Sequence, residues 1–193
     1  ETGITGQATL GPRFDPVTLR MAVYPFETAA NVAYVYDLVT GERLATLETT
    51  LPELVSTSPD FLPGGRYWVG VSRTPSGTSI HEYRTDITVW DAAGALVEEI
   101  PSARELHVIG TDTFAYIPLD GMRWAQDIVL WQDGEHVSLS ALAGVELRRP
   151  QIWRLADDRY MVMSWQSVYI WTRDGLMNRE APVQTFTVGM CTN

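Results

Sequence analysis

The residue types that carry covalent catalysis are sparse in this chain of 193 residues. No serine lies in the Gly-x-Ser-x-Gly turn that exposes a hydrolase nucleophile. The one cysteine, Cys191, lies near the C-terminus and can form no disulfide within the chain. All 14 basic residues are arginines, which excludes a Schiff-base lysine and the lysine of a phosphate-binding loop. The sequence therefore favours a protein that is not an enzyme, and we assign no catalytic residue.

Histidines and carboxylates, the usual proton-transfer groups and metal ligands, are dispersed along the chain. His81, His107 and His136 lie far apart, and none has a second histidine or a carboxylate at a spacing typical of a metal site. The acidic pair Glu98-Glu99 falls in a predicted strand, where neighbouring side chains point to opposite faces, and Asp157-Asp158 falls in a predicted turn. We therefore predict no metal and no cofactor, and expect each histidine to lie at the surface or to be hydrogen-bonded.

The charge balance limits the partners. The 24 acidic residues give a net charge of −10, which argues against nucleic acid because phosphate binding needs a cationic face. No apolar stretch approaches the roughly 20 residues needed to span a bilayer. The chain begins Glu1-Thr2-Gly3 without a methionine. Such a start is typical of a chain whose signal peptide has been cleaved off, or of extra residues that a secretion vector leaves at the N-terminus. We expect an extracytoplasmic location, either secreted or periplasmic.

An internal repeat organises the chain. Four segments combine an apolar strand that ends in an aromatic residue, a turn with glycine, and a second short strand. The aromatic residues follow one another at intervals of 54, 41 and 40 residues, close to the roughly 40–45 residues of a propeller blade. The matched aromatic residues are Tyr36, Trp90, Trp131 and Trp171, and the matched turn glycines are Gly41, Gly94, Gly134 and Gly175.

Further alternating segments precede each of these pairs. A second-strand candidate lies before every aromatic residue, over residues 20–24, 66–72, 113–119 and 159–165. First-strand candidates precede the last three of these, over residues 53–58, 105–110 and 151–155. The pattern predicts an all-β protein, a β-propeller of about four blades with four antiparallel strands each and essentially no helix. We expect an N-terminal extension over residues 1–16 and one propeller-like domain over residues 17–193.

Two stretches resemble the blades of WD-repeat propellers. VYDLVTGERLATLE (35–48) is similar to the third and fourth strands of such a blade, and SPDFLPGGRYWVGVS (58–72) is similar to its Ser-Pro-Asp turn and second strand. RLADDRYMVMSW (154–165) is a looser copy. No Gly-His dipeptide precedes a first strand, so the hydrogen-bonded histidine network of that family is not carried over. The resemblance implies a propeller that binds proteins.

Four blades allow two kinds of closure. Either one chain closes into a four-bladed ring, or two chains join their half-rings into an eight-bladed homodimer. The first repeat lacks a clear leading strand, whereas residues 185–188 form a strand candidate outside any repeat. We therefore expect this terminal segment to close the ring by pairing with the first blade.

Loops between second and third strands emerge on one face of a propeller and carry the candidate binding residues. Arginine, tryptophan, tyrosine and methionine dominate protein interfaces. The candidates are Tyr83, Arg84, Met122, Arg123, Trp124 and Trp165. We predict a non-enzymatic binding or scaffolding propeller, an accessory subunit of a larger extracytoplasmic protein assembly. The alternatives are that Trp124 folds back onto its own blade, and that an enzyme, ligand or ion site occupies the central channel.

Overall fold

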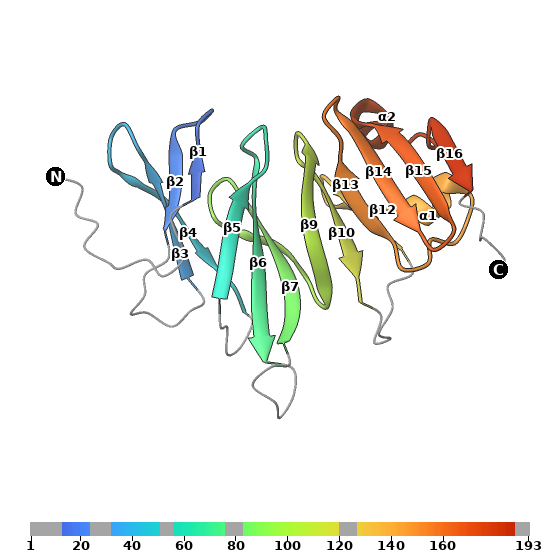
Figure 1. Ribbon diagram of the computed structural model, residues 1–193. Coiled ribbons are helices and arrows are strands. Elements are labelled where there is room, and N and C mark those ends of the chain that lie inside the picture. The colour runs from blue at the N-terminus through green and yellow to red at the C-terminus, as the bar shows by residue number, and fades with distance from the viewer. Residues whose placement is uncertain (1–12, 24–31, 51–55, 76–82, 120–126, 188–193) are drawn as a thin grey trace. The chain divides into compact units, whose positions relative to one another are not determined.

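A computed structural model gives the structure of the chain (Figure 1). The structure describes residues 13–23, 32–50, 56–75, 83–119 and 127–187. The chain divides into two compact units, Glu1–Ser102 and Ala103–Asn193. Each unit contains two antiparallel sheets of four strands, and in every sheet the strands lie side by side in chain order.

The first unit contains the first and second blades. The first blade consists of β1 (Arg13–Asp15), β2 (Arg20–Val23), β3 (Val32–Asp37) and β4 (Arg43–Glu48). The second blade consists of β5 (Ser56–Phe61), β6 (Tyr67–Pro75), β7 (Tyr83–Asp91) and β8 (Leu96–Ile100).

The second unit contains the third and fourth blades. The third blade consists of β9 (Ala103–Gly110), β10 (Thr113–Pro118), β11 (Val129–Gln132) and β12 (Glu135–Ser138). The fourth blade consists of β13 (Gln151–Arg154), β14 (Arg159–Ser164), β15 (Ser167–Thr172) and β16 (Gln184–Thr187). Two helices of five residues, α1 (Leu139–Ala143) and α2 (Arg173–Met177), follow β12 and β15. Four four-stranded antiparallel meanders are the blades of a β-propeller, so the predicted fold class is confirmed.

The repeated aromatic residues occupy one equivalent position. Each is the penultimate residue of the third strand of its blade. The register places each beside a large side chain of the second strand; the pairs are Tyr36 with Met21, Trp90 with Trp68, Trp131 with Phe114, and Trp171 with Tyr160. The three tryptophans are buried, whereas Tyr36 is half-buried. The sequence repeat is therefore a structural repeat.

Three of the four matched glycines have the turn conformation that the sequence predicted. Gly41, Gly94 and Gly134 all have positive φ, the region that glycine enters without steric cost. Gly175 does not, because the chain after β15 forms α2 instead of a hairpin turn. The Thr172 side chain accepts a hydrogen bond from the Gly175 N–H at 3.0 Å and caps this helix. The predicted turn at Gly175 is therefore wrong.

Three further expectations need correction. β1 lies inside the predicted extension 1–16 and gives the first blade a leading strand. The Ser58-Pro59-Asp60 segment lies within β5 instead of forming a turn. The strand predicted to close the ring is β16, which pairs with β15 as the fourth strand of its own blade. The first and the fourth blade are therefore each complete, with four strands of their own.

The first unit is held together by an aliphatic face packed against aromatic rings. Val35 and Leu47 of the first blade form one buried cluster with Trp68 and Trp90 of the second. The Trp90 indole N–H also donates to the carbonyl of Glu48 at 2.5 Å. Burying a large apolar side chain stabilises a fold by roughly 1.5–3 kcal/mol, so this cluster contributes substantially to the contact between the two blades.

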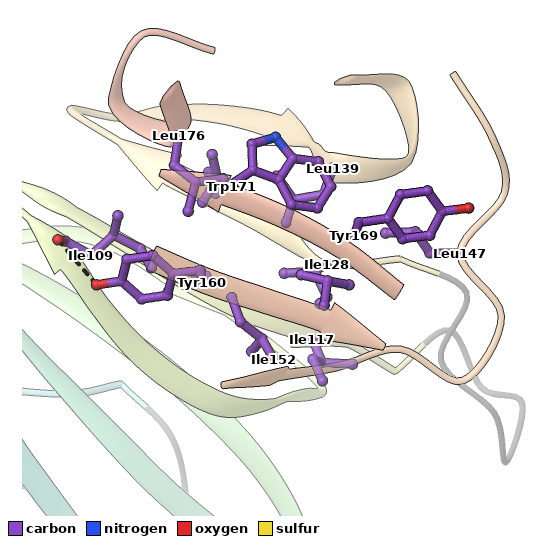
Figure 2. Close-up of a cluster of buried hydrophobic side chains, with 13 residues drawn as sticks. Ile109, Ile117, Ile128, Leu139, Leu147, Ile152, Tyr160, Tyr169, Trp171 and Leu176 are labelled. Atoms are coloured by element: carbon purple, nitrogen blue, oxygen red, sulfur yellow. Dashed lines mark hydrogen bonds between the residues drawn. The ribbon is translucent and has the colours of Figure 1, made fainter. Parts of the chain in front are cut away.

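The core of the second unit has the same organisation (Figure 2). Ile117 and Leu130 of the third blade share a buried cluster with Tyr160 and Trp171 of the fourth. The Tyr160 hydroxyl donates a hydrogen bond to the carbonyl of Ile109 at 3.4 Å. The aromatic ring is therefore buried while its hydroxyl keeps a hydrogen-bond partner. In both units, an aliphatic face of one blade therefore meets an aromatic face of the next.

The contact of the Gly94 turn with β4 predicts a clear difference between two glycine substitutions. A Cβ at Gly94 would lie 2.6 Å from the carbonyl oxygen of Thr46, whereas a Cβ at Gly134 would meet no atom within 4 Å. Both positions have positive φ, which costs a non-glycine residue about 1 kcal/mol or more. We expect Gly94→Ala to lower the free energy of unfolding by at least about 1 kcal/mol more than Gly134→Ala, measured by urea denaturation. Equal losses would contradict the described contact.

Glu99 of β8 predicts an acid-sensitive link between the first two blades. Its carboxylate accepts hydrogen bonds from the Thr49 hydroxyl and the Thr50 N–H, both at 2.9 Å. The Thr50 hydroxyl also donates to this carboxylate. Partial burial raises the pKa of Glu99, but the hydrogen bonds from the Thr50 hydroxyl, the Thr50 N–H and the Thr49 hydroxyl outweigh burial and hold the pKa below the ordinary 4.5. Because the folded-state pKa is the lower one, the stabilisation is present above pH 4.5 and is lost as the pH falls through the folded pKa.

At neutral pH we therefore expect the wild-type chain to have a larger free energy of unfolding than the Glu99→Gln variant. This difference between the two proteins should become smaller at about pH 3, where the Glu99 carboxylate is increasingly protonated. Urea denaturation at the two pH values measures it. A difference that stays constant with pH would show that the carboxylate charge contributes nothing.

Candidate functional site

The structure describes the predicted binding residues only in part. Met122, Arg123 and Trp124 lie outside the described residues. Tyr83 and Arg84 begin β7 and pair with Pro75 and Thr74, so they lie on a strand and not in the predicted loop. Their side chains are outside the described part of the chain. Trp165 is therefore the one of the six candidates whose side chain and surroundings the structure describes.

Trp165 projects from the turn between the second and third strands of the fourth blade. Ser164 and Ser167 face each other at the ends of β14 and β15, so Trp165 and Gln166 form a two-residue turn. The Trp165 side chain is 63% exposed. The Arg149 guanidinium lies over its ring, 5.1 Å from the centroid, a cation–π contact. A charged neighbour thus holds an exposed indole at the surface.

Hydrogen bonds of the Ser164 hydroxyl and of the Trp165 backbone fix this turn to the segment that precedes β13. The Ser164 hydroxyl accepts from the Arg148 N–H at 2.8 Å and lies 3.2 Å from the Arg148 carbonyl. The Trp165 N–H donates to the same carbonyl at 3.0 Å. Ser164 is buried, so these bonds are shielded from water. The two segments therefore form one rigid support for the indole.

A second network holds the Arg148 segment from its other side. Leu147 is buried in the core, and its N–H donates to the Ser140 hydroxyl at 3.2 Å. The Asp127 carboxylate accepts from the Ser138 hydroxyl at 2.5 Å and from the Ser140 hydroxyl at 2.9 Å, at the start of α1. The helix and its cap thus carry the loop that presents Arg148 and Arg149.

A cavity of about 440 Å³ opens beside the indole. Its lining combines the turn, the loop after α1 and one residue of β15: Glu146, Arg148, Ser164, Trp165, Gln166, Ser167 and Tyr169. Arg148 and Glu146 form an exposed ion pair at 3.2 Å. The walls thus offer an aromatic surface, a guanidinium, a carboxylate, hydroxyls and an amide, which suits recognition through hydrogen bonds and stacking. This lining includes no histidine or cysteine that could serve as a base or nucleophile.

Sequence reasoning missed the arginine half of this site. Arg148 lies 16 residues before Ser164 of the turn, and the intervening strands give no local sign that it or Arg149 reaches that turn. The Arg-Arg-Pro run before β13 was the available signal. Paired arginines next to a strand start are common, and only the fold brings them to Trp165.

The remaining ionisable candidates do not converge. The His136 ring nitrogen Nδ1 pairs with the Tyr116 hydroxyl at 2.9 Å, which confirms a hydrogen-bonded histidine. Burial lowers the pKa of His107, although Glu105 at 4.0 Å works against this shift. His81 lies outside the described residues. Within the described ranges, no three histidine, cysteine or acidic residues gather closely enough to hold a metal ion.

The two acidic pairs have structural partners. Asp157 and Asp158 accept hydrogen bonds from Arg159 and Arg154, at 2.7 and 2.6 Å, and these bonds lower the pKa of both carboxyls. Both aspartates follow β13 in the predicted turn. Together with the Glu99 contacts across the first two blades, these pairings show acidic residues used to fix turns and blade contacts.

Solved structures match this fold, whereas no protein-family model and no curated protein matches the chain significantly. A crystal structure of the eukaryotic initiation factor matches with a TM-score of 0.56 at 16% identity, over 95% of this chain and 44% of that one. The acylaminoacyl peptidase of Pyrococcus horikoshii matches with a TM-score of 0.52 at 17% identity, over 84% of this chain and 30% of that one. The β-propeller domain of the Trilobed protease from Pyrococcus furiosus has a TM-score of 0.47 at 15% identity, over 83% of this chain and 53% of that one.

The chain therefore spans about half or less of the length of these structures. At such identities the likeness shows the fold alone. The WD-repeat resemblance stays a resemblance, since no family model supports its signature. Neither short helix in the described part of the chain has the length and apolar character needed to cross a bilayer.

The Ser164 contacts predict how firmly the turn is held. Ser164→Ala removes the acceptor of the Arg148 N–H, so we expect a loss of about 1–2 kcal/mol in unfolding free energy. Gln166→Ala, at an exposed position of the same turn, should change it by less than about 0.5 kcal/mol. Urea denaturation compares the two variants. A Ser164→Ala variant as stable as Gln166→Ala would show that the turn does not depend on this anchor.

Proposed function

We propose that this chain is a non-enzymatic protein-binding propeller, an accessory subunit of a larger assembly. It holds its partner through the surface formed by Trp165, Arg149 and the adjoining cavity. The observation that carries the proposal is the exposed indole stacked by Arg149 at the edge of a cavity. Exposed tryptophan is costly to leave in water, and both tryptophan and arginine are enriched at interface hot spots. The extracytoplasmic setting of the assembly stays a prediction.

The rigid support favours binding over a connecting role. Trp165 rests on a turn fixed by Ser164 and Arg148, so little side-chain and loop freedom is lost when a partner covers it. A two-residue turn needs no large aromatic side chain to form. The polar lining beside the ring supplies the hydrogen-bonding rim that surrounds an anchor.

The alternative of an enzyme, ligand or ion site at a central channel has less support. Among the described residues, no three histidine, cysteine or acidic side chains gather closely enough to hold a metal ion. Asp157, Asp158 and Glu99 instead fix a turn and a contact between blades. Tyr83, Arg84, Met122, Arg123 and Trp124 remain predicted members of the binding face.

The test begins with a pull-down from the native source, with the wild-type chain as bait and mass spectrometry as the readout. For the stoichiometric partner so found, we expect Trp165→Ala to weaken binding by about thirtyfold, the effect of losing a hot-spot aromatic side chain. The melting temperature should barely change because the ring is exposed.

The matched control is Val39→Ala, an exposed apolar residue in the turn after β3. It should leave affinity unchanged. Normal binding by Trp165→Ala would contradict the proposal, as would an equal loss in both variants.

A further inference from the structure

The cavity beside Trp165 has an unusual lining for a site that receives an apolar side chain. Pockets for such groups are lined mainly by hydrophobic residues. None of the described residues around this cavity is aliphatic, and its apolar surface comes from the aromatic rings of Trp165 and Tyr169. The other lining side chains carry hydroxyl, amide, carboxylate and guanidinium groups. The cavity therefore suits a ligand that is polar over most of its surface and has one apolar face.

The charged groups of the described lining cancel each other. Arg148 donates to Glu146 through Nε at 3.3 Å and through Nη2 at 3.2 Å, and both bonds end on the carboxylate oxygen Oε2. The Glu146 oxygen Oε1 and the Arg148 nitrogen Nη1 take no part in this pair, and both side chains are more than half exposed. The pair thus offers a ligand an acceptor and a donor without net charge. Neighbouring hydroxyl groups match this offer, because each hydroxyl can both donate and accept.

The Trp165 ring supplies the surface for an apolar face. The Arg149 guanidinium lies over this ring, 5.1 Å from its centroid, but Arg149 is not among the residues that line the cavity. The ring surface toward the cavity is therefore left for a ligand. The face of an aromatic ring is negative and attracts groups with partial positive charge. The C–H bonds on one face of a pyranose sugar are such groups.

The walls of the cavity are fixed by the fold. Tyr169 belongs to the buried core of the second unit, and Figure 2 shows its hydroxyl pointing away from Trp171. The Ser164 hydroxyl is held by the backbone of Arg148. The volume of about 440 Å³ falls within the roughly 300–1,000 Å³ of small-molecule sites. The cavity is therefore preformed and large enough for a sugar ring.

Backbone strain next to the ring supports a functional role for this arrangement. Arg149 has a φ of 51°, in the left-handed region that favours glycine. It also precedes Pro150, and a proline further restricts the backbone of the residue before it. Strained residues of this kind persist where the surrounding structure holds them, and they cluster at binding sites. The fold thus places the Arg149 guanidinium over the indole at a cost in free energy.

We propose that this cavity binds a neutral pyranose sugar. The sugar ring stacks on Trp165, and its hydroxyl groups bind Glu146, Arg148 and Gln166. This inference rests on the proposed function and deepens it, because it makes the partner a protein that presents such a sugar at its surface. A peptide segment of the partner fits less well, since the described lining gives an apolar anchor side chain no aliphatic contact.

The experiment follows the tryptophan indole N–H signals of the full chain by NMR while a sugar is added. The probes are D-glucose, D-galactose, D-mannose and N-acetyl-D-glucosamine, and glycerol is the control for hydroxyl groups without a ring face. Trp165→Phe and Trp153→Phe identify the signals of Trp165 and of Trp153, which is also exposed. We expect at least one sugar to shift the Trp165 signal in a saturable manner and to leave the Trp153 signal in place. Glycerol should shift neither signal.

Two variants test the polar contacts of the sugar. Glu146→Ala and Arg148→Ala each remove a hydrogen bond from a charged group, so each should weaken sugar binding by about tenfold or more. Arg154→Ala is the matched control, because Arg154 is an exposed arginine whose ion pair with Asp158 lies outside the cavity lining. It should bind the sugar as wild type does. Unchanged signals of the other tryptophans establish that each variant is folded.

Several results would overturn the inference. A Trp165 signal that no probe sugar shifts is one, and full sugar affinity in both Glu146→Ala and Arg148→Ala is another. The partner separates this inference from the proposed function. If Trp165→Ala weakens partner binding while no sugar binds or competes, the proposed function stands and the sugar site is wrong. If a sugar binds while the partner binds Trp165→Ala normally, the sugar site stands and the proposed function is wrong.

Discussion

Near the end of the third strand of the second and fourth blades stands a tryptophan that must leave water, and the aliphatic face of the preceding blade receives it. Trp90 lies against the aliphatic residues of the first blade, and Trp171 lies against those of the third. A sheet with one such face cannot be stable alone, since its largest apolar surface would remain in solvent. The packing of unlike faces therefore makes each unit a pair of blades.

In the first two blades, the residue after the matched aromatic side chain directs the chain into the fourth strand. Asp37 accepts backbone hydrogen bonds from Val39 and Thr40, and Asp91 accepts them from Ala93 and Ala95. Thr172 occupies the same place in the fourth blade but caps a helix. Turns built in this way hold the outer strands without large side chains. A large exposed ring such as that of Trp165 is therefore not required by the fold, which is the physical basis for assigning it a partner.

Much of the fold could be predicted because its signals are local. Alternation located the second strands, and Gly134 located a hairpin turn. The structure shows positive φ at Gly134 and at Asp133 before it. The errors arose where local signals compete. Arg173-Asp174-Gly175 has the composition of a turn, yet the Thr172 hydroxyl starts a helix there. β1 is only three residues long, and Pro59 within β5 resembles a turn residue, so neither strand stands out in the sequence. Of the site, Trp165 was predictable from residue type and loop position, whereas its arginine neighbours depend on contacts between distant segments.

The packing of unlike blade faces is tested most directly by a double-mutant cycle between Leu47 and Trp90. The cycle compares the unfolding free energies of Leu47→Ala, Trp90→Ala and the double variant. Because the two side chains share one core, we expect a coupling energy of roughly 0.5–3 kcal/mol. Leu47→Ala combined with Trp171→Ala, whose clusters lie in different units, should be additive within about 0.5 kcal/mol. A Leu47–Trp90 coupling as small as that of the control pair would contradict the account.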